Sequence, residues 1–330
     1  MQATPPAPLK SHVKNYIGCA PNADNINFSL IRQHYQKQFV KYFEDKPVFK
    51  SLYMDETILK VLSFVIGVLP DSCKVNEKMI LSDTKVFQPK NNTVIFVVRP
   101  DRDVVQQIIH QRDNWKKHDE KEVYILFVPR RTIECDELLH ENNLFFNDDR
   151  ISQINMDLVP LEDDMLSLEL PNNFAHHLLQ DDDNYKINVQ YSLHRLEAVY
   201  GRIEHKFGLG KVAKEIITRV EKNTLNIDQS ASTPSADAEI DALIMIDRDV
   251  DLISPFCVNQ NYEGLLDEFF GIKCCTISVD NKIVYPDDKV RKELGHKDDA
   301  RTDFLLTSED VMFNEIRNKH FNVAGPHLNK

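Results

Sequence analysis

Three aspartates that directly follow an apolar run are the residues whose types and spacing could do chemistry. Asp247, Asp249 and Asp251 come after four consecutive apolar residues, 243–246. An apolar run without polar alternation is typical of a strand that is covered on both faces in a parallel sheet. Ligand sites of open parallel sheets lie beyond the carboxyl ends of the strands, which is where this pattern places the aspartates.

The first chemistry that this spacing suggests is phosphoryl transfer. In haloacid-dehalogenase-type phosphatases a first Asp attacks phosphorus, a second handles the proton of the leaving group, and Mg²⁺ screens both charges. Asp247 and Asp249 have the required spacing. Such an enzyme also needs a later Lys, a Ser or Thr and an acidic pair, for which the chain offers Ser278, Asp287, Asp288 and Lys289. No convincing apolar strand presents these four, so a Mg²⁺-dependent phosphatase is the alternative function.

A structural interpretation of the same residues is favoured. Asp247 and Arg248 would form an ion pair that ties the strand end to its neighbours. Asp249 and Asp251 would cap the following turn, since a carboxylate can accept hydrogen bonds from the first N–H groups of a helical turn. Short catalytic motifs often match by chance, which weakens the phosphatase interpretation.

Other motifs for metal or phosphate chemistry are incomplete. The aspartates imitate the start of a calcium loop, but Leu252 stands where that loop needs Gly, and Val258 where it needs Glu. Gly208, Gly210 and Lys211 precede an expected helix whose N–H groups could bind an anion, yet no complete phosphate-binding motif is present. Neither GxSxG nor HExxH occurs. The favoured interpretation therefore has no catalytic residue, no cofactor and no metal.

The segment around the aspartates resembles a known family signature. DRDVDLISPF at 247–256 and NYEGLLDEFFGI at 261–272 are similar to the signature of the Sec-one/Munc-eighteen (SM) family, and most to its vacuolar-sorting branch. Four further similar segments follow the family's order: VIFVVRP at 94–100, YILFVPRR at 124–131, MDLVPLEDDMLSLELP at 156–171 and EIRNKHFNVAG at 315–325. FVPRR and FNEIRNKHF lean to different vacuolar-sorting paralogue types, so the type stays open.

The resemblance implies roles for individual signature residues. The matching residues are Asp247, Arg248, Asp251, Pro255, Tyr262, Glu263, Gly264 and Asp267. Most of them are expected to be architectural rather than catalytic. Arg248 would pair with Asp251 or Glu263, and Tyr262 and Gly264 would set the turn into the next domain.

The resemblance also implies a function. SM proteins are non-enzymatic clasps that bind SNARE proteins, and the vacuolar-sorting branch works with the subunits of HOPS- or CORVET-type tethering complexes in transport from endosomes to lysosomes or the vacuole. Holding two partner helices in register would supply in advance part of the ordering entropy of coiled-coil assembly. SNARE contact in the family uses a cleft between the first and third domains. The chain from about Leu266 onward would then begin one wall of that cleft.

The apolar periodicity predicts an α/β fold. Apolar strands at 52–54, 94–98 and 123–128 are separated by helical stretches, which is the rhythm of a parallel doubly wound sheet. Aromatic and apolar residues from Phe28 to Tyr42 recur at helical spacing, and apolar stripes at 189–200 and 212–220 predict two more helices. The resemblance adds a second α/β domain and the start of a mostly helical third domain.

The expected domain organisation follows from these elements and from the resemblance. It comprises a flexible tail at 1–25, SM domain 1 at 26–150, the first part of SM domain 2 at 151–265 with a flexible loop at 223–239, and a truncated beginning of SM domain 3 at 266–330. Family members are near twice this length. A partly built second domain would leave apolar faces uncovered, which predicts aggregation or dependence on a partner.

Composition restricts the class of partner. A formal net charge of -12 argues against binding nucleic acid or an anionic membrane through a general basic surface. The acidic runs at 162–164 and 181–183 are expected to be solvated loops. No apolar run approaches the roughly 20 residues that span a bilayer, and six cysteines without a CxxC pair predict reduced, mostly buried thiols. We expect a cytoplasmic protein that reaches late endosomal and lysosomal or vacuolar membranes through protein partners.

Overall fold

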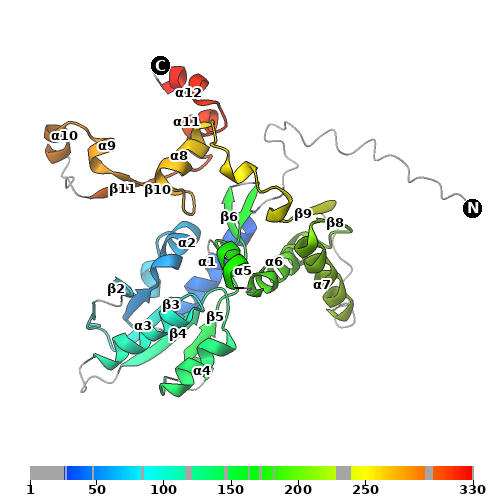
Figure 1. Cartoon of the computed structure of the whole chain (residues 1–330). Helices are drawn as coiled ribbons and strands as arrows, with labels where there is room; N and C mark the ends of the chain where they lie inside the picture. Colours follow the sequence, from blue (N-terminus) through cyan, green and yellow to red (C-terminus); the bar gives the residue numbers. More distant parts are fainter. Residues whose placement is uncertain are drawn as a thin grey trace, which may run out of the picture.

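The computed structural model describes most of the chain. The described residues are 26, 28–46, 48–82, 85–115, 121–144, 148–162, 164–170, 173–180, 183–227, 239–293 and 300–328. The expected tail at 1–25 lies outside them, as does most of the expected loop at 223–239. Figure 1 shows a parallel sheet in the first half of the chain, a smaller strand pair beside it, and residues 262–328 on another side.

A parallel sheet of five strands organises the first part of the chain. Its order is β2-β1-β3-β4-β5. The strands are β1 (Lys50–Met54), β2 (Val75–Ile80), β3 (Thr93–Val98), β4 (Glu122–Phe127) and β5 (Ile151–Gln153). The three strands predicted from apolar runs are confirmed as the central ones. The edge strand β2 escaped prediction because its alternate side chains are exposed and polar residues interrupt its apolar pattern.

Helices cover both faces of this sheet because alternate side chains of each strand point to opposite sides. Ile95 and Val97 of β3 join a core with α1 (Ser29–Glu44) and α2 (Glu56–Ile66). Val94 and Phe96 join a second core with α3 (Arg102–Asp113) and α4 (Ile133–Glu141). Every residue of β3 is buried, as expected for the central strand of a doubly wound sheet.

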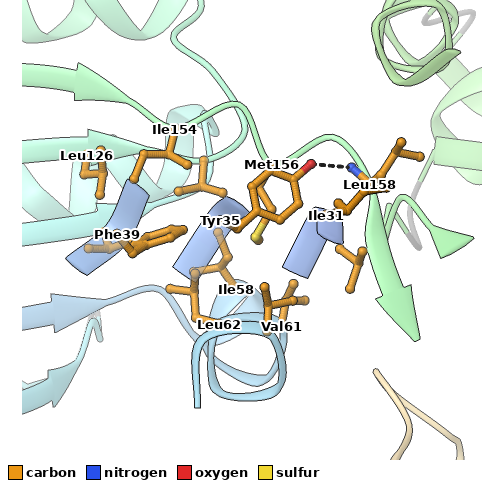
Figure 2. Close-up of a cluster of buried hydrophobic side chains, with 14 of the residues drawn as sticks. Ile31, Tyr35, Phe39, Ile58, Val61, Leu62, Leu126, Ile154, Met156 and Leu158 are labelled. Carbon is orange, nitrogen blue, oxygen red and sulfur yellow. Dashed lines mark hydrogen bonds between the residues drawn. The ribbon is translucent and has the colours of Figure 1, made fainter. Parts of the chain in front are cut away.

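The predicted aromatic stripe of α1 is confirmed. Ile31, Tyr35 and Phe39 are buried and face α2 and the chain that follows β5 (Figure 2). The Leu158 N–H donates to the Tyr35 hydroxyl at 3.3 Å. Burial raises the pKa of Tyr35, so the hydroxyl stays protonated in its apolar surroundings. This stripe joins the first helix to the end of the sheet.

A hairpin and then a second, smaller parallel sheet follow in sequence. The hairpin β6 (Val159–Glu162) and β7 (Met165–Ser167) leads to α5 (Asn173–Gln180), α6 (Asn184–Tyr200), β8 (His205–Leu209), α7 (Lys211–Ile227) and β9 (Ala242–Ile246). β8 and β9 pair in parallel and form the second sheet. The helix α7 continues to Ile227, so the prediction that the loop begins at residue 223 was wrong by five residues. These residues extend the amphipathic helix instead.

Among the described residues, only one face of the β8–β9 pair is covered. Leu243 and Met245 pack against α6 and α7. On the other face Ile244 is 69% exposed and Ile246 is 60% exposed, together with Phe207 of β8 at 54%. The prediction that residues 243–246 are covered on both faces was therefore wrong, because the described part of the chain supplies helices to one side only.

The last part of the chain contains mostly short helices around one antiparallel strand pair. It comprises the 3-10 turns η4 (Arg248–Val250) and η5 (Ser254–Phe256), then α8 (Tyr262–Phe270), β10 (Thr276–Asp280), α9 (Asn281–Val284), α10 (Asp288–Glu293), β11 (Arg301–Leu305), α11 (Val311–Ile316) and α12 (Phe321–Leu328). β10 pairs with β11. Two 3-10 turns of the first part, η2 (Asp71–Cys73) and η3 (Asp148–Arg150), complete the elements. In the described residues no helix is long and apolar enough to cross a membrane.

Candidate functional site

The carboxylate of Asp247 caps a helix. It accepts hydrogen bonds from the N–H groups of Val212 at 2.8 Å and Ala213 at 2.6 Å, in the first turn of α7. These N–H groups have no partner within their own helix, and the helix dipole favours a negative charge there. The anion at this helix terminus is thus a side chain of the protein itself.

The glycines before α7 allow this contact. Gly210 has a φ of +107°, and a Cβ at this position would overlap the Asp247 carboxylate. A Cβ on Gly208 would lie 3.0 Å from the backbone nitrogen of Lys214 in α7. The partial phosphate-binding pattern is therefore explained by close packing between β8, α7 and the end of β9.

Arg248 and Asp251 form the turn after β9. The Arg248 guanidinium donates to the backbone carbonyl of Asp251 at 2.6 Å and lies 4.0 Å from its carboxylate, rather than pairing with Asp247. Asp251 Oδ1 accepts from the N–H groups of Ile253 and Ser254 at 3.0 Å each. A hydrogen bond from the Ser254 side chain, followed by those from the two N–H groups, lowers the pKa of Asp251. Asp249 is exposed on η4.

Pro255 and the residues around it continue this turn at the surface. Pro255 lies in the first positions of η5, where its fixed φ suits a helical turn and its missing N–H is no loss. The apolar neighbours Ile253 and Phe256 are exposed. The signature segment 247–256 therefore combines a half-buried cap at one end with an exposed apolar surface at the other.

Two signature residues define the ends of α8. Asn261 accepts from the Gly264 N–H at 2.8 Å, and a Cβ on Gly264 would collide with Asn259 and Asn261. At the other end, Asp267 accepts from the Ile272 N–H at 2.8 Å. Gly264 is thus required by the close approach of the preceding loop.

The start of α8 is bonded to a segment far along the chain. The Tyr262 N–H donates to the carbonyl of Lys319 at 3.1 Å, and the Glu263 N–H donates to that of Arg317 at 3.0 Å. Asn261 and His320 form an isolated antiparallel bridge beside them. The structure therefore joins 261–264 to 317–320, two of the segments that resemble the SM family.

Arg317 connects three parts of the chain through charge. Its Nε and Nη2 donate to the two carboxylate oxygens of Glu263 at 2.8 Å each, and its Nη1 donates to Glu162 and to the Ser308 hydroxyl at 3.0 Å. The side chain of Arg317 is 11% exposed and that of Glu162 is 6% exposed. The hydrogen bonds to Glu263 raise the pKa of Arg317. We call Arg317, Glu162 and Glu263 the charge cluster; it ties β6 to α8 and to the segment after α11.

A turn between α8 and β10 makes a second contact with the first part of the chain. Cys274 and Cys275 have φ values of 48° and 54°, and Lys273 and Thr276 on either side exchange backbone hydrogen bonds at 2.9 and 3.0 Å. These features match a type I′ turn, which normally needs Gly or Asn. Holding a non-glycine residue at positive φ costs on the order of 1–2 kcal/mol.

Both cysteines of this turn are buried. Cys274 belongs to the core that contains α1, α2 and β1, and the Cys275 thiol lies 3.9 Å from the Leu161 carbonyl of β6. Burial raises the pKa of Cys274 to about 12 and that of Cys275 to about 11. They are protonated, inert thiols at neutral pH.

The strand order of the first sheet changes direction between β1 and β3. Arg99 follows β3, and its guanidinium donates to the Glu169 carbonyl at 2.8 Å. Burial lowers the pKa of Arg99, while Asp55, Glu169 and Cys274 act on it electrostatically. Doubly wound sheets bind ligands at this position. Here side chains of the protein itself surround Arg99.

The residues required for a phosphatase are not assembled. Ser278 lies on β10, and Asp287 accepts from the Lys289 N–H at the start of α10. Figure 1 shows β10 and α10 in another part of the molecule from the end of β9, where Asp247 lies. Among the residues that the structure describes, no group of three or more His, Cys, Asp or Glu side chains could hold a metal ion.

Sequence reasoning missed Arg317 and Arg99 as site residues, and it was wrong about Glu162, which is buried rather than solvated. The signal that could have identified them is a charged residue inside or directly after an apolar segment, as in VIFVVRP and VPLE. A charge in such a place needs a partner, because burying an unpaired charge is costly.

The fold and the site together define a doubly wound α/β protein in which signature residues cap helices and tie distant segments together. The model of the Sec1 family matches residues 50–330, and the chain belongs to this family, the Sec-one/Munc-eighteen family of the sequence analysis. The match covers both the first sheet and the charge cluster.

Curated relatives agree with this assignment. The chain is 29% identical over 301 residues to vacuolar protein sorting-associated protein 33B of Danio rerio, covering 91% of this chain and 46% of the relative. It is 28% identical to the Homo sapiens 33B protein and 25% identical to vacuolar protein sorting-associated protein 33A of Rattus norvegicus, with 92% of this chain covered in both cases and 48% and 51% of the relatives. The chain thus spans about half the length of these relatives.

Solved structures show the same fold. The SM protein Vps45 in complex with the Qa SNARE Tlg2 superposes with a TM-score of 0.59 at 15% identity, covering 92% of this chain and 52% of Vps45. The Unc18–syntaxin 1 complex of Monosiga brevicollis gives a TM-score of 0.55 at 12% identity, covering 90% and 51%. At these identities the likeness establishes the fold alone.

Proposed function

We propose that this protein binds SNARE proteins and regulates vesicle tethering and membrane fusion. Support comes from its membership of the Sec1 family and from relatives named as vacuolar protein sorting proteins. Three proteins of similar fold were solved as complexes: Vps45 with the Qa SNARE Tlg2, Sly1p with an N-terminal peptide of Sed5p, and Unc18 with syntaxin 1.

The observation that carries the proposal is the charge cluster. A protein that holds a helical partner between two walls needs those walls at a fixed separation, because preorganisation lowers the entropy that binding costs. Arg317 has a side chain that is only 11% exposed and is hydrogen-bonded to Glu162 of β6 and to Glu263 of α8, so it fixes residues 262–328 relative to the β6–β7 hairpin. We propose that the SNARE helices lie between the first sheet and these residues.

The proposed domains keep the bounds expected from the sequence. Residues 26–150 form the first domain, 151–265 part of the second and 266–330 the beginning of the third. The finer assignment is transport from endosomes to lysosomes or the vacuole, with tethering-complex subunits of the HOPS or CORVET type as partners. The exposed apolar side chains of Ile244, Ile246 and Phe256 support a protein-covered surface on the second part. Membrane association would then be indirect.

A binding titration tests the proposal. Labelled endolysosomal SNARE motifs are titrated with the protein, with Arg317→Met and with Arg219→Met. Arg317→Met removes a buried tether, whereas Arg219→Met removes only the exposed pair with Glu215 on α7. We expect Arg317→Met to weaken binding about tenfold through lost preorganisation. Equal affinities for all three proteins would contradict the proposed role of the charge cluster, and no binding at all would contradict the proposed function.

The phosphatase alternative is tested with the same preparations. Both carboxylate oxygens of Asp247 accept hydrogen bonds from α7, which leaves the side chain poorly placed to attack phosphorus. We expect no Mg²⁺-dependent hydrolysis of p-nitrophenyl phosphate above the buffer rate. Hydrolysis that disappears in Asp247→Asn would establish the enzyme instead.

A further inference from the structure

Two contacts of different kinds join residues 262–328 to the first part of the chain. The charge cluster is one, and the buried Cys274–Cys275 turn is the other. We propose that this turn is a detachable latch: when it is docked, it holds residues 262–328 against the carboxyl edge of the first sheet, and when it is released, the charge cluster remains as a tether. This inference does not depend on SNARE binding.

The docking place of the turn is specific. Cys274 belongs to the apolar core that also contains residues of β1 and β3, and Arg99 and Glu169 are its charged neighbours. Cys275 lies against β6 through the Leu161 carbonyl. The turn therefore lies near Arg99, which follows β3 at the edge of the sheet where doubly wound proteins bind ligands.

The backbone of the turn favours release. Both cysteines are at positive φ, and neither is Gly or Asn, the residues that adopt this conformation at least cost. Such strain persists only where the surrounding packing compensates for it. Withdrawing the turn relieves the strain, so the docked and released forms are closer in free energy than burial of the thiols alone implies.

The elements on either side of the turn allow it to withdraw. The turn precedes β10, which pairs with β11, and it follows α8, whose start is bonded to the segment at Arg317. β10, β11 and α8 belong to the same part of the chain as the turn (Figure 1). Undocking thus requires no strand pairing of the first sheet to break.

Alkylation of the individual thiols tests the latch. The whole protein is treated with iodoacetamide under native conditions, and the modification of each cysteine is followed by peptide mass mapping. Cys257 is exposed, whereas Cys73 and Cys135 are buried in the cores on the two faces of the first sheet. A docked, protonated thiol reacts only after it is exposed. We expect Cys257 to react first, Cys274 and Cys275 next, and Cys73 and Cys135 last, at least about tenfold slower than the turn.

Equal rates for the turn and for Cys73 and Cys135 would overturn the proposal, because the turn would then be exposed only by global unfolding. Rates for the turn that equal that of Cys257 would overturn it too, because the turn would not be docked. Arg317→Met sharpens the test: weakening the tether should speed modification of Cys274 and Cys275 about tenfold, with Cys73 and Cys135 remaining the slowest thiols. Arg219→Met is the matched control and should alter none of these rates.

Discussion

The two parallel sheets of this protein use similar strand sequences in different surroundings. β3 of the first sheet reads TVIFVV and is buried throughout, with helices on both faces. β9 of the second reads ALIMI and is covered on one face, so its alternate residues are exposed. An apolar strand therefore does not determine its own burial. Its burial depends on the elements that pack against it. Within the described residues, the first sheet has helices on both faces.

The contacts between the parts show the same contrast for charges. The side chains of Arg317 and Glu162 are 11% and 6% exposed and 155 positions apart, whereas those of Arg219 and Glu215 are 43% and 33% exposed and lie on one helix. An exposed pair gains little because water screens it. A buried pair holds its segments together, since the loss of one partner leaves the other charge buried and unpaired, which is costly.

The largest expected change in the free energy of unfolding comes from replacing a phenylalanine in the first sheet, and a phenylalanine in the second sheet serves as the comparison. Phe96→Ala empties part of a closed core in β3 and should lower the free energy of unfolding by about 3–5 kcal/mol. Phe207→Ala in β8, where the side chain is half exposed, should cost less than about 1 kcal/mol. Urea unfolding followed by circular dichroism measures both. If Phe207→Ala cost as much as Phe96→Ala, the β8–β9 face would be covered in solution.

The next effect concerns the two ion pairs. Arg317→Met leaves Glu162 buried without its cation and should lower the free energy of unfolding by about 3 kcal/mol. Arg219→Met should change it by less than about 0.5 kcal/mol. The same urea titration gives both values. Similar losses in the two variants would mean that the charge cluster is as well solvated as a surface pair.

The smallest effect is the pH dependence of the buried thiols. Folding raises the pKa of Cys274 from 9.0 to about 12 and that of Cys275 from 9.0 to about 11. The unfolded thiols thus lose protons first. The stability that these groups contribute is fully present below pH 9 and is lost as the pH rises towards 11 and 12. At pH 10 the expected loss is about 1 kcal/mol for each thiol.

Cysteine variants isolate this dependence. Replacing both turn cysteines by Ala should flatten the decline of the unfolding free energy between pH 8.5 and 10.5, relative to the unchanged protein. Cys257→Ala is the control, because that thiol is exposed and should leave the profile unaltered. A double variant with the original pH profile would show that the turn thiols are solvated.

The sequence by itself determined the elements whose signal is local. The apolar runs at 94–98 and 123–128 and the aromatic stripe that ends at Tyr42 specified two central strands and the first helix, because period and composition are read within one segment. The segments similar to the SM family predicted the family that residues 50–330 match. These predictions did not require knowledge of which segments meet.

Only the tertiary structure decided the roles of the polar residues. Asp247 had the spacing of a phosphatase nucleophile, but its partners are N–H groups 34 and 35 positions earlier in the chain. Arg317 pairs with Glu162 across 155 positions, and Cys274 of the turn belongs to the same core as residues of α1, far earlier in the chain. Such pairs depend on chain topology, which brings distant residues together without leaving a periodic pattern in the sequence. For the same physical reason, the exposed face of β9 could not be predicted from its apolar residues: burial is a property of what packs against a strand.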